Sequence, residues 1–188
     1  DFGGAEKVGN NFFDGCKRLT KVVFSPDMTE ISDGMFYNCD SLKTIDIPSQ
    51  IEYIGKWAFF NCDSLENVSC ENIKKIGEES FMGCLKLKEV SLNENVEEIL
   101  KRAFYKCISL DNLIVTAGTI GDEAFYWCTS LENLSFNENV KSIKTRAFSR
   151  CTSLKSVVFN KNIESLGKYS FAGNTALSSV EFGENIEN

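Results

Sequence analysis

The sequence predicts an α/β solenoid, a right-handed superhelix of about eight turns of roughly 21–23 residues each. We expect a parallel β-sheet on its concave face and short helical or irregular segments opposite. Two observations support this prediction: a phenylalanine recurs at nearly constant intervals along the whole chain, and a leucine follows each one six residues later. So constant a period is typical of stacked repeats. The phenylalanines are Phe13, Phe36, Phe59, Phe81, Phe104, Phe125, Phe148 and Phe171.

Each turn begins with a short strand, marked by two apolar residues at positions i and i+2. This spacing places both side chains on one face, which we expect to point inward. The pairs are Val22/Phe24, Ile45/Ile47, Val68/Cys70, Val90/Leu92, Leu113/Val115, Leu134/Phe136, Val157/Phe159 and Val180/Phe182. A second apolar residue such as Ile31 or Ile54 follows, then a tight helical turn around the phenylalanine. No single turn can bury its own face, so the turns must stack at about 4.8 Å, the strand spacing of a sheet.

The repeat length separates the known repeat classes. The period fits leucine-rich repeats, whose units have about 20–29 residues, and is too short for ankyrin or tetratricopeptide units. Residues 39–62, CDSLKTIDIPSQIEYIGKWAFFNC, resemble the BspA-like, or Treponema-type, leucine-rich repeat. The pattern I-G-x-x-A-F-x-x-C-x-S-L returns with small variations at residues 120–131 and 143–154, and the resemblance covers the whole chain.

Local departures from this pattern are few. Asn174 replaces the last cysteine of the series, and Gly118 replaces an apolar anchor in the short junction between the fifth and sixth turns. The whole of residues 1–188 is expected to be a single leucine-rich-repeat domain. Because both ends fall inside repeats and no polar capping unit is present, we expect the chain to be a fragment of a longer array.

Composition excludes several function classes. The chain has no histidine, which removes the usual general base and the commonest metal ligand. No acid–base pair, activated nucleophile or phosphate-binding glycine loop is recognisable, so we expect no catalytic residues, cofactor or metal. A formal net charge of -7 argues against nucleic acid as a partner. No apolar run is long enough to predict direct membrane insertion.

Seven of the eight cysteines occupy one position in successive turns. They are Cys16, Cys39, Cys62, Cys84, Cys107, Cys128 and Cys151. Stacked turns give these side chains parallel directions, which do not suit the dihedral angle of a disulfide. We therefore expect a column of buried free thiols, with Cys70 in a core position of a strand. The chain has no C-x-x-C motif, and the cysteines do not reveal the compartment.

The strand residues that alternate with the core pair predict one candidate binding surface on the concave face. They are Thr44, Asp46, Asn67, Ser69, Glu89, Ser91, Asn112, Ile114, Asn133 and Ser135. A sheet that is buried on one side has polar residues on the other in any case, so a solvated face without a ligand is the alternative. Two glycosylation sequons, at Asn67 and Asn133, fall on this face.

A second candidate surface is a stripe of aromatic residues, most of them directly after the repeat phenylalanine. It comprises Tyr37, Phe60, Tyr105, Tyr126 and Trp127, with Met82 in the equivalent position between Phe60 and Tyr105. Aromatic residues and methionine are enriched at protein interfaces. The alternative is that these rings only pack on their counterparts in adjacent turns.

The resemblance implies a non-enzymatic binding module, and specifically a surface adhesion protein. Proteins of this type are commonly surface molecules of bacteria and anaerobic protists, so the expected partner is a protein or the extracellular matrix and the expected location is the cell surface or the extracellular space. The alternative is an intracellular structural scaffold, docked in a larger cytoplasmic or cytoskeletal assembly. Free thiols suit the reducing compartment that this alternative requires.

Overall fold

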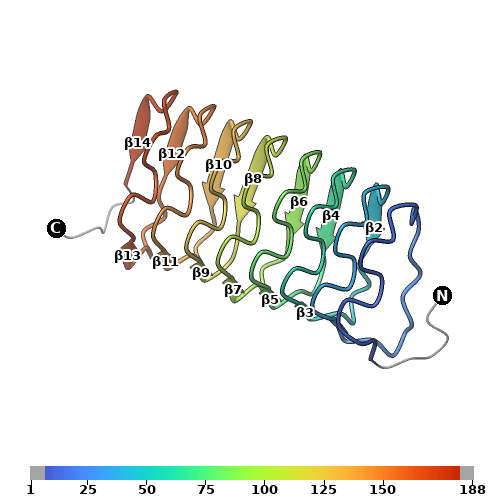
Figure 1. Cartoon of the computed structure of the whole chain (residues 1–188). Coiled ribbons are helices and arrows are strands. Elements are labelled where there is room, and N and C mark those ends of the chain that lie inside the picture. The colour runs from blue at the N-terminus through green and yellow to red at the C-terminus, as the bar shows by residue number, and fades with distance from the viewer. Residues whose placement is uncertain (1–6, 183–188) are drawn as a thin grey trace.

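The chain folds as a solenoid whose turns stack in one direction, as the sequence predicts. The computed structural model describes residues 7–182, so the two ends of the expected domain lie outside the described residues. Figure 1 shows the turns side by side as a row of similar coils, with the N-terminal and C-terminal turns at opposite ends of the row. Counted from the two-residue strand before each phenylalanine to the longer strand after it, seven turns carry two strands each. The first predicted strand pair, Val22/Phe24, lies in irregular backbone instead.

One sheet, which we call the edge sheet, runs through the whole row along its lower edge in Figure 1. Its seven parallel strands have two residues each, and consecutive turns pair in register, as Ile31 does with Ile54. The strands are β1 (Glu30–Ile31), β3 (Tyr53–Ile54), β5 (Lys75–Ile76), β7 (Glu98–Ile99), β9 (Thr119–Ile120), β11 (Ser142–Ile143) and β13 (Ser165–Leu166).

The longer strands form the predicted parallel sheet, which we call the main sheet. It falls into two parts: β2, β4 and β6 form one ladder, and β8, β10, β12 and β14 form the other. Within each part the predicted apolar pairs are in register, for example Val68 with Val90. The strands are β2 (Thr44–Asp46), β4 (Asn67–Cys70), β6 (Glu89–Leu92), β8 (Asn112–Val115), β10 (Asn133–Phe136), β12 (Ser156–Val158) and β14 (Ser179–Glu181).

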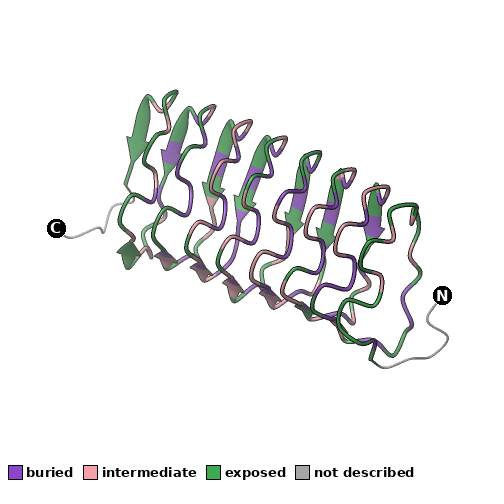
Figure 2. Ribbon diagram, in the orientation of Figure 1, coloured by how far each residue is buried: buried purple, intermediate pink, exposed green. Residues whose placement is uncertain are grey.

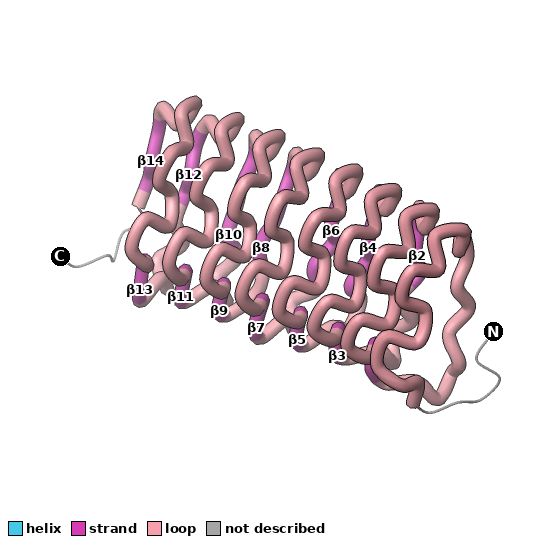
Figure 3. The backbone as a smooth tube through the Cα atoms, in the orientation of Figure 1, coloured by secondary structure: helices cyan, strands magenta, loops and turns pink. Residues whose placement is uncertain are grey.

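The expected helical turn around each phenylalanine is absent from the described residues, where this segment is an irregular chain of turns (Figure 3). We call this segment the phenylalanine ribbon. In the third turn, the N–H groups of Trp57, Phe59 and Asn61 donate to carbonyls of the next turn, while those of Ala58 and Phe60 close local turns. A helix would use every one of these N–H groups internally. The alternation makes the ribbon a third layer of hydrogen bonds between turns.

The alternation depends on two residues per turn that have positive φ. One lies two residues before the phenylalanine and the other two residues after it, and we call the two rows the first and second αL columns. All 16 positions have φ between 54° and 78°. The first column is Asn11, Gly34, Trp57, Glu79, Arg102, Glu123, Arg146 and Tyr169, and the second is Gly15, Asn38, Asn61, Gly83, Lys106, Trp127, Arg150 and Gly173.

Columns of identical side chains fill the interior, and Figure 2 shows buried segments recurring from turn to turn. The repeat phenylalanines stack along the whole row with ring centroids 5.0–5.7 Å apart. From Phe36 to Phe148 their side chains are fully buried, as are the leucines from Leu42 to Leu154. Such offset stacks contribute about 0.5–1.5 kcal/mol per pair beyond the burial of apolar area. The core is therefore continuous from turn to turn, which is the condition for a solenoid without its own closed domain core.

One expectation about the short fifth-to-sixth junction was wrong. The strand register places Ala117, not Gly118, level with Val96 and Val140, and the Ala117 side chain is fully buried there. The apolar column therefore continues through the shortened turn with a smaller side chain. Gly118 lies next to this position, and its N–H donates to the carbonyl of Val96.

Gly77 has a steric reason within the I-G motif, although Leu100 and Lys144 occupy the same position in other turns. A Cβ at Gly77 would lie 2.5 Å from the carbonyl carbon of Gly55 in the preceding turn. No side chain fits at that distance, so glycine permits the close stacking of these backbones.

Candidate functional site

All ten residues of the predicted concave binding face are exposed on the outward side of the main sheet. The strand register brings them into rows across the turns: Asp46, Ser69 and Ser91 form one row. A second row joins Ile114 to Ser135. Thr44, Asn67 and Glu89 are in register on one side of the break in the sheet, and Asn112 and Asn133 on the other. The structure therefore places the ten side chains on one surface, in two groups.

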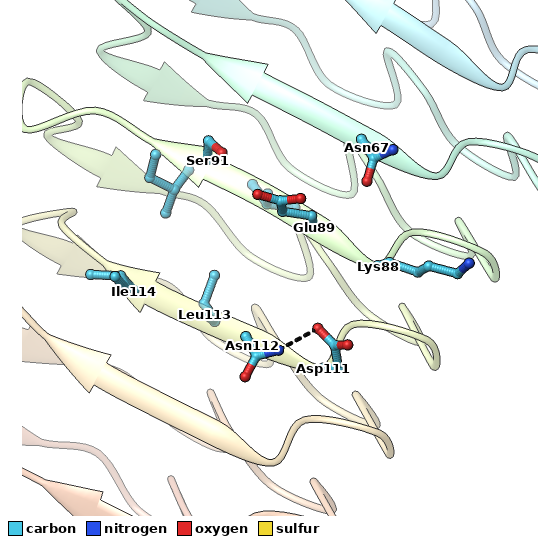
Figure 4. A pocket seen from close by; sticks show the side chains of 10 residues that line it. Asn67, Lys88, Glu89, Ser91, Asp111, Asn112, Leu113 and Ile114 are labelled. Atoms are coloured by element: carbon cyan, nitrogen blue, oxygen red, sulfur yellow. Dashed lines mark hydrogen bonds between the residues drawn. The ribbon is translucent and has the colours of Figure 1, made fainter.

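A groove lies where the two parts of the main sheet meet, between β6 and β8 (Figure 4). In the part of the chain that the structure describes, no ladder joins these two strands. The groove has a volume of about 630 Å³. Five of the predicted residues line it: Asn67, Glu89, Ser91, Asn112 and Ile114. We call this feature the sheet groove.

The sheet groove is lined by both polar and apolar side chains. Ile114 is 64% exposed, and Leu92 is half-buried although its equivalents in the neighbouring turns, Cys70 and Val115, are fully buried. The side-chain amide of Asn112 donates to Asp111 at 2.8 Å, as Figure 4 shows. Lys88 and Glu89 supply one charge of each sign on the other wall. An apolar floor edged by such groups is typical of a surface that binds another molecule.

Sequence reasoning missed part of this groove. Lys88 and Asp111 precede their strands, and Leu92 and Leu113 were assigned to the core. The missing signal is the break in the ladder between β6 and β8, which brings these residues to one hollow. Nothing in the sequence between β6 and β8 departs from the repeat spacing of the neighbouring turns, so the pattern alone could not locate it.

The aromatic stripe exists but is divided into two clusters. Tyr37 stacks on Phe60 with centroids 4.7 Å apart, and Tyr105 stacks on Tyr126 at 5.2 Å. Trp127 meets Tyr126 edge to face at 5.7 Å. All five rings are half-buried. The stacking fits the alternative in which the rings pack on their counterparts, while their exposed edges remain available at the surface.

The cysteines form the predicted column, and all eight are free. Seven are buried, and Cys16 is half-buried. Burial removes the seven from the candidate chemistry: desolvation raises the pKa of the Cys151 thiol to about 12 and the pKa of Cys107 well above its ordinary value. The structure adds a contact that the sequence did not predict: each thiol from Cys39 to Cys151 in this column donates to the carbonyl of the preceding turn's phenylalanine, for example Cys62 to Phe36 at 3.1 Å. At the end of the column Asn174 accepts the N–H of Cys151 instead.

The described residues contain no cluster of three or more side chains suited to hold a metal ion. Within the same residues no helix has the length and apolar character needed to cross a membrane. Of the two sequon asparagines, Asn67 is exposed at the sheet groove, and Asn133 donates its side-chain amide to Asn112 at 2.7 Å.

Comparison with known proteins gives the fold and sequence pattern a context. The family model described as the BspA type leucine-rich repeat region matches residues 6–119 and 104–188, in six copies. A leucine-rich cell surface protein from Faecalibacterium prausnitzii is similar in structure, with a TM-score of 0.76 and 30% identity over 88% of this chain and 46% of that protein. A leucine-rich repeat protein from T. pallidum has a TM-score of 0.73 and 27% identity over 88% of this chain and 84% of that chain. No curated protein matches significantly.

The chain thus spans less than half of the F. prausnitzii protein to which it is similar. The family match covers the described solenoid from end to end, including the short fifth-to-sixth turn. Proteins of this class are typically non-enzymatic and bind other proteins. The chain belongs to the BspA-type leucine-rich repeat family.

Proposed function

We propose that the chain is a non-enzymatic binding module of a cell-surface protein, and that the sheet groove holds an extended segment of a protein partner. The single observation that carries this proposal is the break between β6 and β8, where five predicted surface residues line one hollow of about 630 Å³. A location at the cell surface is supported by the similar protein from F. prausnitzii, which is described as a cell surface protein.

An extended segment is the occupant that the groove fits. β6 and β8 share no ladder, yet they lie as close together as the paired strands β2 and β4, so no further strand fits between them. The segment instead lies over the two strands, against the side chains that line the groove. Exposed Ile114 and half-buried Leu92 supply apolar contacts for alternate side chains of the segment, and Lys88 and Asp111 supply charge contacts at the strand starts.

Binding to immobilised extracellular matrix proteins tests the groove. Ser91→Arg places a long side chain in the groove, and Ser135→Arg makes the same change on the same face outside it. We expect Ser91→Arg to reduce binding by about tenfold or more, the equivalent of 1.4 kcal/mol, while Ser135→Arg binds like the unchanged protein. Matrix digested with protease should no longer bind. Equal binding by both variants would contradict the assignment of the groove.

Location is tested separately, by labelling intact cells of the source organism with a membrane-impermeant biotin reagent. Labelling without lysis supports the surface assignment. Labelling only after lysis would refute it, and would leave the intracellular scaffold, with its partners to be identified by co-purification.

A further inference from the structure

A second hollow, of about 700 Å³, lies on the phenylalanine ribbon of the last three turns. Its walls come from three consecutive turns, and Trp127, Arg150 and Tyr169 from the two αL columns line it together with Tyr126 and Arg146. We call it the basic–aromatic hollow. It shares no residue with the sheet groove.

Cations surround the rings of this hollow. Lys106 lies 5.0 Å from the Trp127 ring centroid and Arg150 lies 5.8 Å from it, and these residues come from the turns before and after the tryptophan. The next ring, Tyr169, has the Arg146 guanidinium at 5.6 Å and the Lys168 ammonium at 5.1 Å. The cations are thus held by rings at fixed positions, each contact contributing about 0.5–1 kcal/mol at an exposed site.

Three of these cations have no acidic partner. Within the described residues, no carboxylate lies within 4.0 Å of the charged groups of Lys106, Arg150 or Lys168. The contrast is Arg102, whose Nε donates to Glu123 at 2.6 Å and which also faces Glu79. The unpaired cations therefore remain available to a ligand.

The charge of this part of the ribbon is opposite to that of the whole chain, whose net charge is -7. From three residues before to three residues after each phenylalanine, the last four turns carry six cationic residues and two acidic ones. The first four turns carry one cationic residue and four acidic ones over the same positions. An anion is accordingly attracted to the last turns and repelled from the first.

The backbone at the hollow is occupied, which restricts how a ligand can bind. The N–H of Trp127 donates to Ser149 and that of Arg150 to Ala172, both in the following turn. A peptide therefore cannot add as a strand between these turns, because their facing backbone groups are already paired. The groups left for recognition are guanidinium, ammonium, aromatic edges and the exposed hydroxyls of Thr152 and Thr175.

We propose that the basic–aromatic hollow binds an acidic glycan that runs along the solenoid across the last turns. Arginine binds carboxylate and sulfate groups through paired N–H donors, so the unpaired Arg150 would hold an anionic group, while Arg146 pairs with Glu123 at 3.7 Å. The threonine hydroxyls and the ring edges would contact the sugar hydroxyls and carbon atoms between them. Repetition of the cationic side chains from turn to turn suits a polymer with repeated charge.

Titrations with four probes of similar length test the proposal: a heparin-derived oligosaccharide, a hyaluronate oligosaccharide, neutral dextran and poly-glutamate. The chain has two tryptophans, so Trp57→Asn leaves Trp127 as the only indole and its fluorescence as the readout. We expect heparin or hyaluronate to bind and to weaken as salt is added, because screening shortens the reach of charges. Heparin alone indicates recognition of sulfate, and binding of both indicates that carboxylate suffices.

Arg150→Asn removes one unpaired cation and installs the residue found in the same column at Asn38 and Asn61, so its fold is maintained. We expect it to weaken glycan binding about tenfold. Arg18→Asn makes the same change at an exposed arginine of the first turn and should have no effect. Absence of glycan binding, tighter binding of poly-glutamate, or equal losses in the two variants would each overturn the proposal.

The sheet-groove variant Ser91→Arg separates this inference from the proposed function. It should bind the glycan like the unchanged protein, since its site lies on the main sheet. Conversely, Arg150→Asn should bind matrix protein from which glycans have been removed as well as the unchanged protein does. A loss of glycan binding in Ser91→Arg would contradict the assignment to the basic–aromatic hollow and leave the protein-binding proposal unaffected.

Discussion

The first four turns and the last four turns share one backbone but differ at the two αL columns. In the first four turns, six of the eight positions are glycine or asparagine, the residues that adopt positive φ at least cost. In the last four turns only Gly173 is of this kind. The φ values are the same in both halves. The repeat therefore fixes the conformation whatever the residue type, and in the last four turns the columns carry side chains that can form contacts, such as the ion pair of Arg102 with Glu123.

The interior shows no such difference. Phe36 and Phe59 stack at 5.2 Å in the first half, and Phe125 and Phe148 at 5.1 Å in the second. Thiols donate to phenylalanine carbonyls in both halves. The difference between the halves is thus confined to the surface, and variants in the core and in the columns can test that separation.

The largest effect is expected from the phenylalanine column. Phe59→Ala and Phe125→Ala each remove a fully buried ring that stacks on two neighbours, so each should lower the free energy of unfolding by about 3–5 kcal/mol. Urea unfolding followed by circular dichroism measures this. A much smaller loss in one half would show that the two interiors are not equivalent.

Alkaline pH should lower the free energy of unfolding through the buried thiol column in both halves. Burial raises the pKa of Cys62 and Cys128 above the ordinary value, so the folded chain retains protons that the unfolded chain loses. The contribution of these thiols to the free energy of unfolding is therefore fully present below the ordinary thiol pKa of about 8.5 and falls as the pH rises above it. Between pH 8 and 9.5 each thiol accounts for about 0.8 kcal/mol of this loss per pH unit, because the thiol of the unfolded chain is only partly ionised there.

Cys62→Ala and Cys128→Ala should each flatten the dependence by that amount. Urea unfolding between pH 8 and 9.5, with a reducing agent present, measures the slope. Equal slopes in the unchanged protein and in both variants would mean that these thiols ionise in the folded state.

Substitutions that swap arginine and asparagine in the second αL column should have opposite effects on stability in the two halves. Arg150→Asn is expected to stabilise the chain and Asn38→Arg to destabilise it, each by about 1 kcal/mol, because the first relieves strain at positive φ and the second creates it. Thermal and urea unfolding compare the two variants. If Arg150→Asn destabilised the chain, the contacts of the arginine would contribute more to stability than its positive φ costs.

Sequence periodicity predicted the parts of this molecule that repeat. The columns Phe13–Phe171, Leu19–Leu177 and Cys16–Cys151 follow from the spacing alone, because identical residues at a constant period must stack. The ten surface positions of the main sheet followed from strand alternation. The positive φ at Trp127 and Arg150 could not be predicted, since those residue types rarely adopt it. Gly15, Gly34, Asn38 and Asn61 in the same columns were the available signal.

The smallest effect on stability is expected from substitutions of single lysines. Here a lysine in an ion pair and a lysine without one should differ in their effect on glycan binding. Lys155 forms an exposed ion pair with Glu132 at 2.6 Å, and such a pair contributes about 0–1 kcal/mol. Lys155→Asn should therefore change unfolding little and leave glycan binding intact, because its charge is already paired. Lys106→Asn should weaken glycan binding, since Lys106 is unpaired and lies on Trp127. Equal binding by the two variants would show that overall charge, and not the placement of cations at the basic–aromatic hollow, attracts the anion.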